Sequence, residues 1–160
     1  MSKAVLYMSM SVDGFIAGPN EGPGNGLGDG GHRLHEWFLP GPGADRQGAA
    51  ERLTGVNREV TDEAMATGAV VVGRRTFELA EGWGGDHHDG VPIFVLSRRQ
   101  PAAGPQWPAV TYVSDIKRAM DLAREAAGGK DVLVHGAGTE RPGVHRGAGH
   151  PRRHLRQAYL

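Results

Sequence analysis

The amino-acid sequence predicts an α/β fold with a central, mostly parallel sheet flanked by helices. The continuous apolar run at residues 69–72 is typical of a strand that is buried on both faces, and shorter apolar runs recur along the chain, as in residues 131–135. Segments of helical pattern separate these runs, and this alternation favours right-handed crossovers between parallel strands. A length of 160 residues fits one domain with a sizeable core.

Five strands are expected, at residues 3–10, 69–72, 92–96, 110–113 and 131–135. Short helices are expected at residues 32–39, from Thr61 to Gly68, and directly after Gly73. The clearest helix spans residues 115–127, with Ser114 or Asp115 as its N-cap and two glycines after its end. Residues 18–31 form a loop rich in Gly and Pro, and loops of that length are usually functional or disordered.

Composition and charge exclude several classes of function. The chain has 18 basic and 18 acidic residues, so no net charge recruits nucleic acid or an anionic membrane. It has no cysteine, which excludes disulfides, a cysteine-ligated zinc and a thiol nucleophile. No apolar run is long enough to cross a bilayer. We therefore expect a cytoplasmic protein that acts on a small-molecule substrate and binds neither nucleic acid nor a membrane.

Three strand ends lead into turns suited to a phosphate or a sugar. They are Gly73-Arg74-Arg75-Thr76, Ser97-Arg98-Arg99 and Gly136-Ala137-Gly138-Thr139. In a parallel sheet these ends share one edge, where open α/β folds bind ligands. Glycine lets the backbone approach a pyrophosphate, an arginine fork holds a phosphate, and paired arginines favour NADP over NAD. The alternative, that these are ordinary turns and solvated arginines, stays open.

Other titratable residues are weaker candidates. Residues 86–89 (Asp-His-His-Asp) resemble a metal-binding tract, yet adjacent ligands on a glycine-rich loop rarely form a closed site, so we expect a solvated loop and no metal. His32 and His35 could act as ligands or bases, although a surface helix is the simpler interpretation. Asp13 forms either an Asx turn with Gly14 or part of a site. A serine nucleophile has no support, since no G-x-S-x-G elbow is present.

Four motifs along residues 3–139 resemble, in order, those of the dihydrofolate reductase-like family. They are Ser9-Met10-Ser11-Val12-Asp13-Gly14-Phe15-Ile16-Ala17, Val72-Gly73-Arg74-Arg75-Thr76-Phe77, Val95-Leu96-Ser97-Arg98 and Val134-His135-Gly136-Ala137-Gly138-Thr139. More specifically, they resemble the branch that contains the C-terminal reductase domain of riboflavin biosynthesis. The resemblance implies a three-layer fold and NADPH as the cofactor. It also implies hydride transfer to a C=N or C=O bond of a small heterocyclic (pyrimidine- or pterin-like) or sugar-derived substrate.

The resemblance further implies roles for individual residues. Asp13 matches an acid at the substrate, where it would orient the substrate or relay a proton. The residues that match cofactor-binding positions are Ser9, Ile16 and Ala17 beside the nicotinamide; Gly73, Arg74, Arg75 and Thr76 at the adenosine-side phosphates; Ser97 and Arg98 at the 2′-phosphate; and Gly136, Ala137, Gly138 and Thr139 at the pyrophosphate. The alternative from another class is a non-catalytic nucleotide-binding protein, such as an inactive, truncated family member.

Residues 140–160 depart from the family, so we divide the chain into a reductase domain at residues 1–139 and a basic tail. The tail contains five Arg, three His and one Glu without an apolar period, whereas the family continues with a helix and hydrophobic strands. We expect the tail to stay outside the core, as in a frameshifted or truncated family member, and the final strands to be missing. An uncovered sheet edge then favours a homodimer. Folate reduction is not expected, because the context of Glu36 does not match the acid of classical dihydrofolate reductases.

Overall fold

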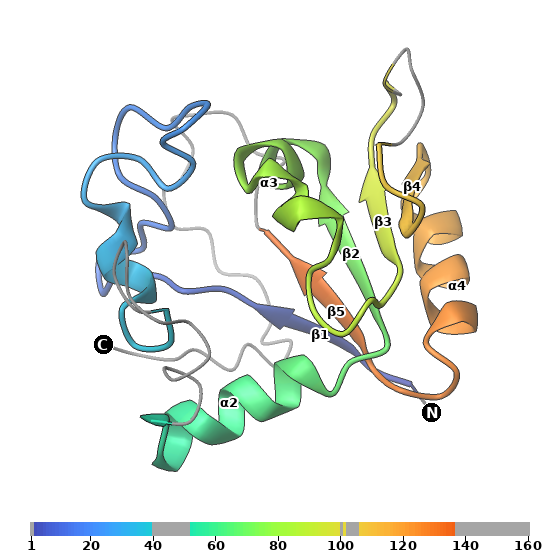
Figure 1. Ribbon diagram of the computed structural model, residues 1–160, viewed down its shortest axis with the longest axis horizontal. Helices are drawn as coiled ribbons and strands as arrows, with labels where there is room; N and C mark the ends of the chain where they lie inside the picture. The colour runs from blue at the N-terminus through green and yellow to red at the C-terminus, as the bar shows by residue number, and fades with distance from the viewer. Residues whose placement is uncertain (1, 40–51, 100, 102–105, 137–160) are drawn as a thin grey trace.

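The computed structural model describes residues 2–39, 52–99, 101 and 106–136, and its central feature is a parallel sheet (Figure 1). The strands of the described part are β1 (Ala4–Tyr7), β2 (Ala69–Gly73), β3 (Ile93–Leu96), β4 (Val110–Val113) and β5 (Val132–His135). Their order in the sheet is β1-β5-β2-β3-β4, and every neighbouring pair is parallel. This confirms the predicted α/β class.

Helices flank the sheet on both faces. They are the 3-10 helix η1 (Gly31–His35), α2 (Gly55–Met65), α3 (Arg74–Leu79), the 3-10 helix η2 (Glu81–Gly85) and α4 (Ile116–Ala126). Figure 1 shows α3 and α4 on opposite faces of the sheet. No helix among the described residues is long and apolar enough to cross a membrane.

Alternate residues of the strands face two different core clusters, as the pleat requires. Against α4 lie Val71, Phe94 and Val132, and the helix contributes small residues, Ala119 and Ala123, which let it approach the sheet closely. The opposite face holds a larger aromatic cluster. Its members are Val70, Val72, Ile93, Val95, Val110 and Leu133 with Phe77 of α3, and Tyr7, Trp83, Val91, Trp107 and Tyr112 pack against them.

Several predicted boundaries were wrong by a few residues. The first strand ends at Tyr7 rather than residue 10, and the segment 32–39 forms only a 3-10 turn that ends at His35. The second helix begins at Gly55, not at Thr61. Thr61 lies inside this helix, where its hydroxyl donates to the Asn57 carbonyl (2.9 Å) instead of accepting from a backbone amide as an N-cap does.

The glycine-rich loop 18–31 is ordered by its own hydrogen bonds. Gly18 N donates to Leu27 O (2.8 Å) and Asp29 N to Pro19 O (2.7 Å), which joins the two ends of the loop. The Asp29 carboxylate accepts from the side-chain amides of Asn20 (2.6 Å) and Asn25 (2.9 Å), and these bonds lower the pKa of Asp29. The loop is therefore a compact unit of the kind that packs on its own side chains.

Of the two N-cap residues that the sequence allows for helix α4, Ser114 and Asp115, the structure uses Asp115. Asp115 has extended backbone angles, and its Oδ1 accepts from the amide of Arg118 at 2.8 Å. This bond satisfies one of the amides that has no partner inside the helix.

Replacing Asp115 with Ala should lower the free energy of unfolding by about 1 kcal/mol, because the Arg118 amide loses its acceptor. Asp115→Asn keeps an oxygen at the same place and should lose much less. Urea denaturation of the three proteins measures both differences. Equal losses in the two variants would contradict the capping role.

Candidate functional site

The carboxyl ends of the strands are level along one edge of the sheet. In the register, Gly73 of β2 lies beside Leu96 of β3, and His135 of β5 lies between Val72 of β2 and Tyr7 of β1. The turns that follow β2, β3 and β5 therefore begin side by side. This is the edge at which open α/β sheets bind ligands.

Gly136 brings the first and third of these turns into contact. It has a φ of +86°, and a Cβ atom at this position would lie 2.9 Å from the Cβ and Cγ2 atoms of Thr76 in α3 and would overlap its hydroxyl. Glycine is required here on both counts, for the left-handed backbone and for the close approach. The remaining residues of the predicted turn, Ala137, Gly138 and Thr139, and the tail 140–160 lie outside the described residues.

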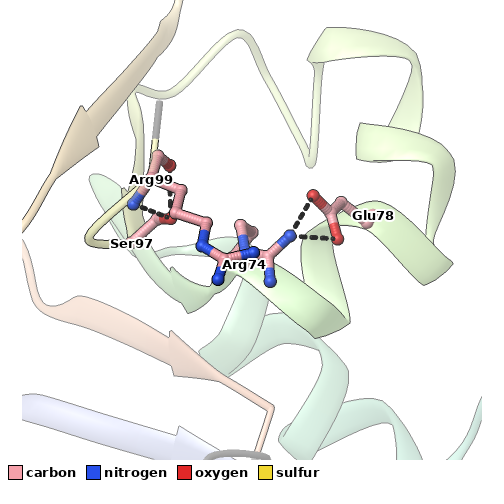
Figure 2. Close-up of polar contacts among 4 residues, drawn as sticks. All are labelled: Arg74, Glu78, Ser97 and Arg99. Atoms are coloured by element: carbon pink, nitrogen blue, oxygen red, sulfur yellow. Dashed lines mark hydrogen bonds and ion pairs between the residues drawn. The ribbon is translucent and has the colours of Figure 1, made fainter. Parts of the chain in front are cut away.

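The two arginines at the start of α3 have acidic partners within the protein. The Nη1 atom of Arg74 donates to both carboxylate oxygens of Glu78 (2.9 and 3.1 Å), as Figure 2 shows. The Nε and Nη2 atoms of Arg75 both donate to one oxygen of Glu21, which ties the glycine-rich loop to α3. Exposed ion pairs of this kind contribute little stability, so Arg74 can exchange Glu78 for a ligand anion at small cost.

Ser97 forms a tight turn directly after β3. The side chain is buried, and its hydroxyl accepts from the Arg99 amide (3.0 Å) and donates to the Arg99 carbonyl (2.5 Å). In Figure 2 the side chain of Arg99 points toward that of Arg74, and both Arg98 and Arg99 are exposed. The sequence places both arginines in a turn suited to a phosphate, but the family resemblance gives a role to Arg98 only. The Ser-x-Arg turn, in which a serine bonds the backbone two residues on, is the sequence signal that singles out Arg99 as a further candidate.

Of the residues that the resemblance places at the nicotinamide, Ser9 is buried and its hydroxyl accepts from the indole Nε1 of Trp37 (3.1 Å). Ile16 and Ala17 are half-buried on the loop after β1. Asp13 is exposed, and its Oδ1 accepts from the Ser11 hydroxyl at 2.6 Å. These roles stay predictions.

Histidines occupy the other half of the same edge, and the sequence-based site did not include them. His135 is the last residue of β5, and its ring stacks on that of Trp83 (centroids 5.2 Å apart, 15° between planes). The ring of His87 meets that of His135 at 5.2 Å and 78°. The prediction of a solvated loop at residues 86–89 was wrong for its two histidines, because His88 is only 8% exposed and His87 is half-buried.

Burial keeps His87 and His135 uncharged at neutral pH. It lowers the pKa of His87 to about 3, with smaller effects from His135 and His88. It lowers the pKa of His135 to about 4, with a further effect of His35. The pKa of His35 is also lowered, first by burial. Within the described ranges, no three histidine or acidic side chains are placed to hold a metal ion.

No known protein family and no curated protein matches this chain in sequence. Among solved structures, one that is similar is a crystal structure named "Putative riboflavin biosynthesis protein" from Shewanella sp. PV-4. The two share 18% identity with a TM-score of 0.47, and the match covers 85% of this chain and 65% of that chain. This chain thus spans less than two thirds of that protein. The α/β class rests on the sheet itself, and we take no function from this similarity.

Gly136→Ala should destabilise the protein more than Gly129→Ala. Both glycines have φ near +90°, but a Cβ atom at Gly129 would meet nothing within 4 Å, whereas one at Gly136 would press into Thr76. The left-handed backbone alone costs about 1–2 kcal/mol for alanine, and only Gly136→Ala adds the steric overlap. Thermal and urea unfolding measure both variants. Equal destabilisation would contradict the close contact between β5 and α3.

The free energy of unfolding should fall as the pH drops from 6.5 toward 5. In the folded protein His87 and His135 have pKa values of about 3 and about 4, well below the value of about 6.5 in the unfolded chain. The unfolded chain therefore binds more protons in this window, and the difference approaches about two protons near pH 5. Above about pH 7.5 the histidines of the unfolded chain are also unprotonated, so these groups contribute no pH dependence there.

Urea unfolding at several pH values measures how steeply the free energy of unfolding changes with pH. His87→Gln should reduce this slope by the equivalent of about one proton, while the same change at the exposed His32 should leave the slope unaltered. A free energy of unfolding that stays constant between pH 7 and pH 5 would contradict the burial of uncharged histidines.

Proposed function

We propose that this chain is an NADPH-dependent reductase that passes a hydride to a C=N or C=O bond of a small heterocyclic or sugar-derived substrate. The observation that carries the proposal is the level register of β2, β3 and β5, which sets Gly73, Ser97 and Gly136 side by side at one edge. The order of motifs that resembles the dihydrofolate reductase-like family, in its riboflavin-biosynthesis branch, supports the same function.

The residues at this edge fit the charged end of a dinucleotide phosphate. Arg74, Arg98 and Arg99 supply guanidinium groups from two neighbouring strand ends, and the Ser97 hydroxyl fixes the backbone of Arg99. Guanidinium forks bind phosphate through paired, charge-assisted hydrogen bonds. Arg75 donates to Glu21, and these bonds join the loop 18–31 to α3 beside the site.

The cofactor supplies the hydride when bound, so the protein mainly binds and orients. Holding donor and acceptor close accounts for much of the rate in such reactions. Ser9, Ile16 and Ala17 lie on or after the end of β1, where they would line the reacting ring. Asp13, on the following turn, would orient the substrate.

A non-catalytic dinucleotide-binding protein is the second candidate. It is favoured by the exposure of Asp13 and by the engagement of its carboxylate with Ser11. Titration of NADPH, followed by its fluorescence, separates the two functions when combined with a panel of carbonyl and imine substrates. Binding with oxidation of NADPH by any of them supports the reductase, and binding without turnover supports the second candidate.

Arg74→Ala, Arg98→Ala and Arg99→Ala should each weaken the binding of NADPH by about tenfold to a hundredfold, because each removes a charge-assisted bond to the 2′-phosphate. The binding of NADH, which lacks that phosphate, should change less than about twofold. Arg118→Ala on α4 is the control and should affect neither cofactor. Calorimetric titration measures all four variants, and equal losses for both cofactors would refute the assignment.

A further inference from the structure

A chain of hydrogen bonds joins two histidines to the backbone before β2. The Thr67 hydroxyl donates to Ala64 O (2.7 Å), so His88 Nε2 donates to the hydroxyl and carbonyl oxygens of Thr67 (both 3.2 Å). The Nδ1 atoms of His87 and His88 lie 2.7 Å apart, so one of them donates to the other. The chain thus gives partners to both ring nitrogens of His88 and to Nδ1 of His87.

Two further imidazole nitrogens are buried without such a partner. They are Nδ1 of His135, at the end of β5, and Nδ1 of His35, at the end of η1, and neither has a hydrogen-bond partner among the described residues. Buried polar atoms almost always have one. Nδ1 of His87 and both ring nitrogens of His88 have partners, so the buried imidazole nitrogens that lack one among the described residues are Nδ1 of His35 and Nδ1 of His135.

The turn that carries Trp83, whose ring stacks on His135, has a strained backbone. Trp83 has a φ of +51°, in the left-handed region that is costly for a residue with a side chain. Its ring is held by an edge contact with Phe77 (6.0 Å) and stacks on His135. Backbone strain of this kind persists where the surroundings impose it, often at ligand sites.

We propose that His135 and His35 are specificity-determining residues that hold an uncharged carbonyl or amide group of the molecule bound at the carboxyl edge of β5. A neutral imidazole can donate to a carbonyl oxygen or accept from an amide N–H. A carboxylate or phosphate at the same place would need a protonated ring, which burial opposes. Since Gly136 follows His135 directly, the group would lie beside the turn that the dinucleotide is proposed to use.

This inference deepens the proposed function, since it specifies what the substrate presents to the site, but its test contains no dinucleotide. Benzamide and benzoate serve as probes, because both are flat enough to lie along Trp83 and differ only in the amide and the carboxylate. The full chain, labelled with ¹⁵N in its imidazoles, is titrated with each by NMR. We expect millimolar benzamide to shift the Nδ1 resonances of His35 and His135 and benzoate to leave them unchanged.

The exposed His32, on the same turn as His35, provides the internal control and should respond to neither probe. Absence of a response to benzamide at both His35 and His135, or an equal response to benzoate, would overturn the proposal. If the unmodified chain does not bind NADPH but benzamide still shifts both histidines, the reductase is refuted and the proposed histidine site is not.

His135→Phe separates this role from a structural one. The variant keeps a ring on Trp83 and removes the unpaired nitrogen, so Tm should rise by about 2–4 °C while the benzamide response at His35 is lost. His32→Phe should change neither quantity. A lower Tm with the response at His35 retained would make His135 purely structural and overturn the proposal. The titration of the unmodified chain decides the matter even if the variant does not fold.

Discussion

The pairing of β5 between β1 and β2 is the constraint on which the rest of the structure depends. The last described strand enters the middle of the sheet, in register with Tyr7 on one side and Val72 on the other. Its residues join both core clusters, with Val132 facing α4 and Leu133 facing α3. The same insertion sets His135 and Gly136 at the centre of the carboxyl edge. A shift of β5 by one residue would exchange its two faces and separate Gly136 from Thr76.

The carboxyl edge has two chemically different halves. At the end of β2, Arg74 pairs with the exposed Glu78 and Arg75 with the half-buried Glu21. Arg98 and Arg99 are exposed at the end of β3, so this half has positive charge at little desolvation cost. At the ends of β1 and β5 the polar groups are half-buried imidazoles that stay uncharged. A ligand with one anionic end and one neutral, planar end matches this division. The proposed reductase and the proposed role of His135 both follow from it.

Local features that reduce stability are concentrated around this edge. Trp83 has a strained backbone, and two imidazole nitrogens are buried without a partner in the described part of the chain. The sheet beneath them is by contrast closely packed, with Val70, Ile93 and Val95 fully buried. A rigid sheet can hold costly arrangements of this kind where they serve binding.

Sequence alone determined the features that depend on local pattern. The strand at 110–113 was predicted at its observed position, and the cap of α4 was narrowed to Ser114 or Asp115, because apolar runs and capping residues act over a few neighbours. Only the tertiary structure decided the order of the strands, the bonds of Arg75 to Glu21 and the stacking of Trp83 on His135. These contacts join residues more than 50 positions apart, and which partners meet depends on where each crossover returns the chain. Sequence therefore located the arginine half of the edge, and folding created the histidine half.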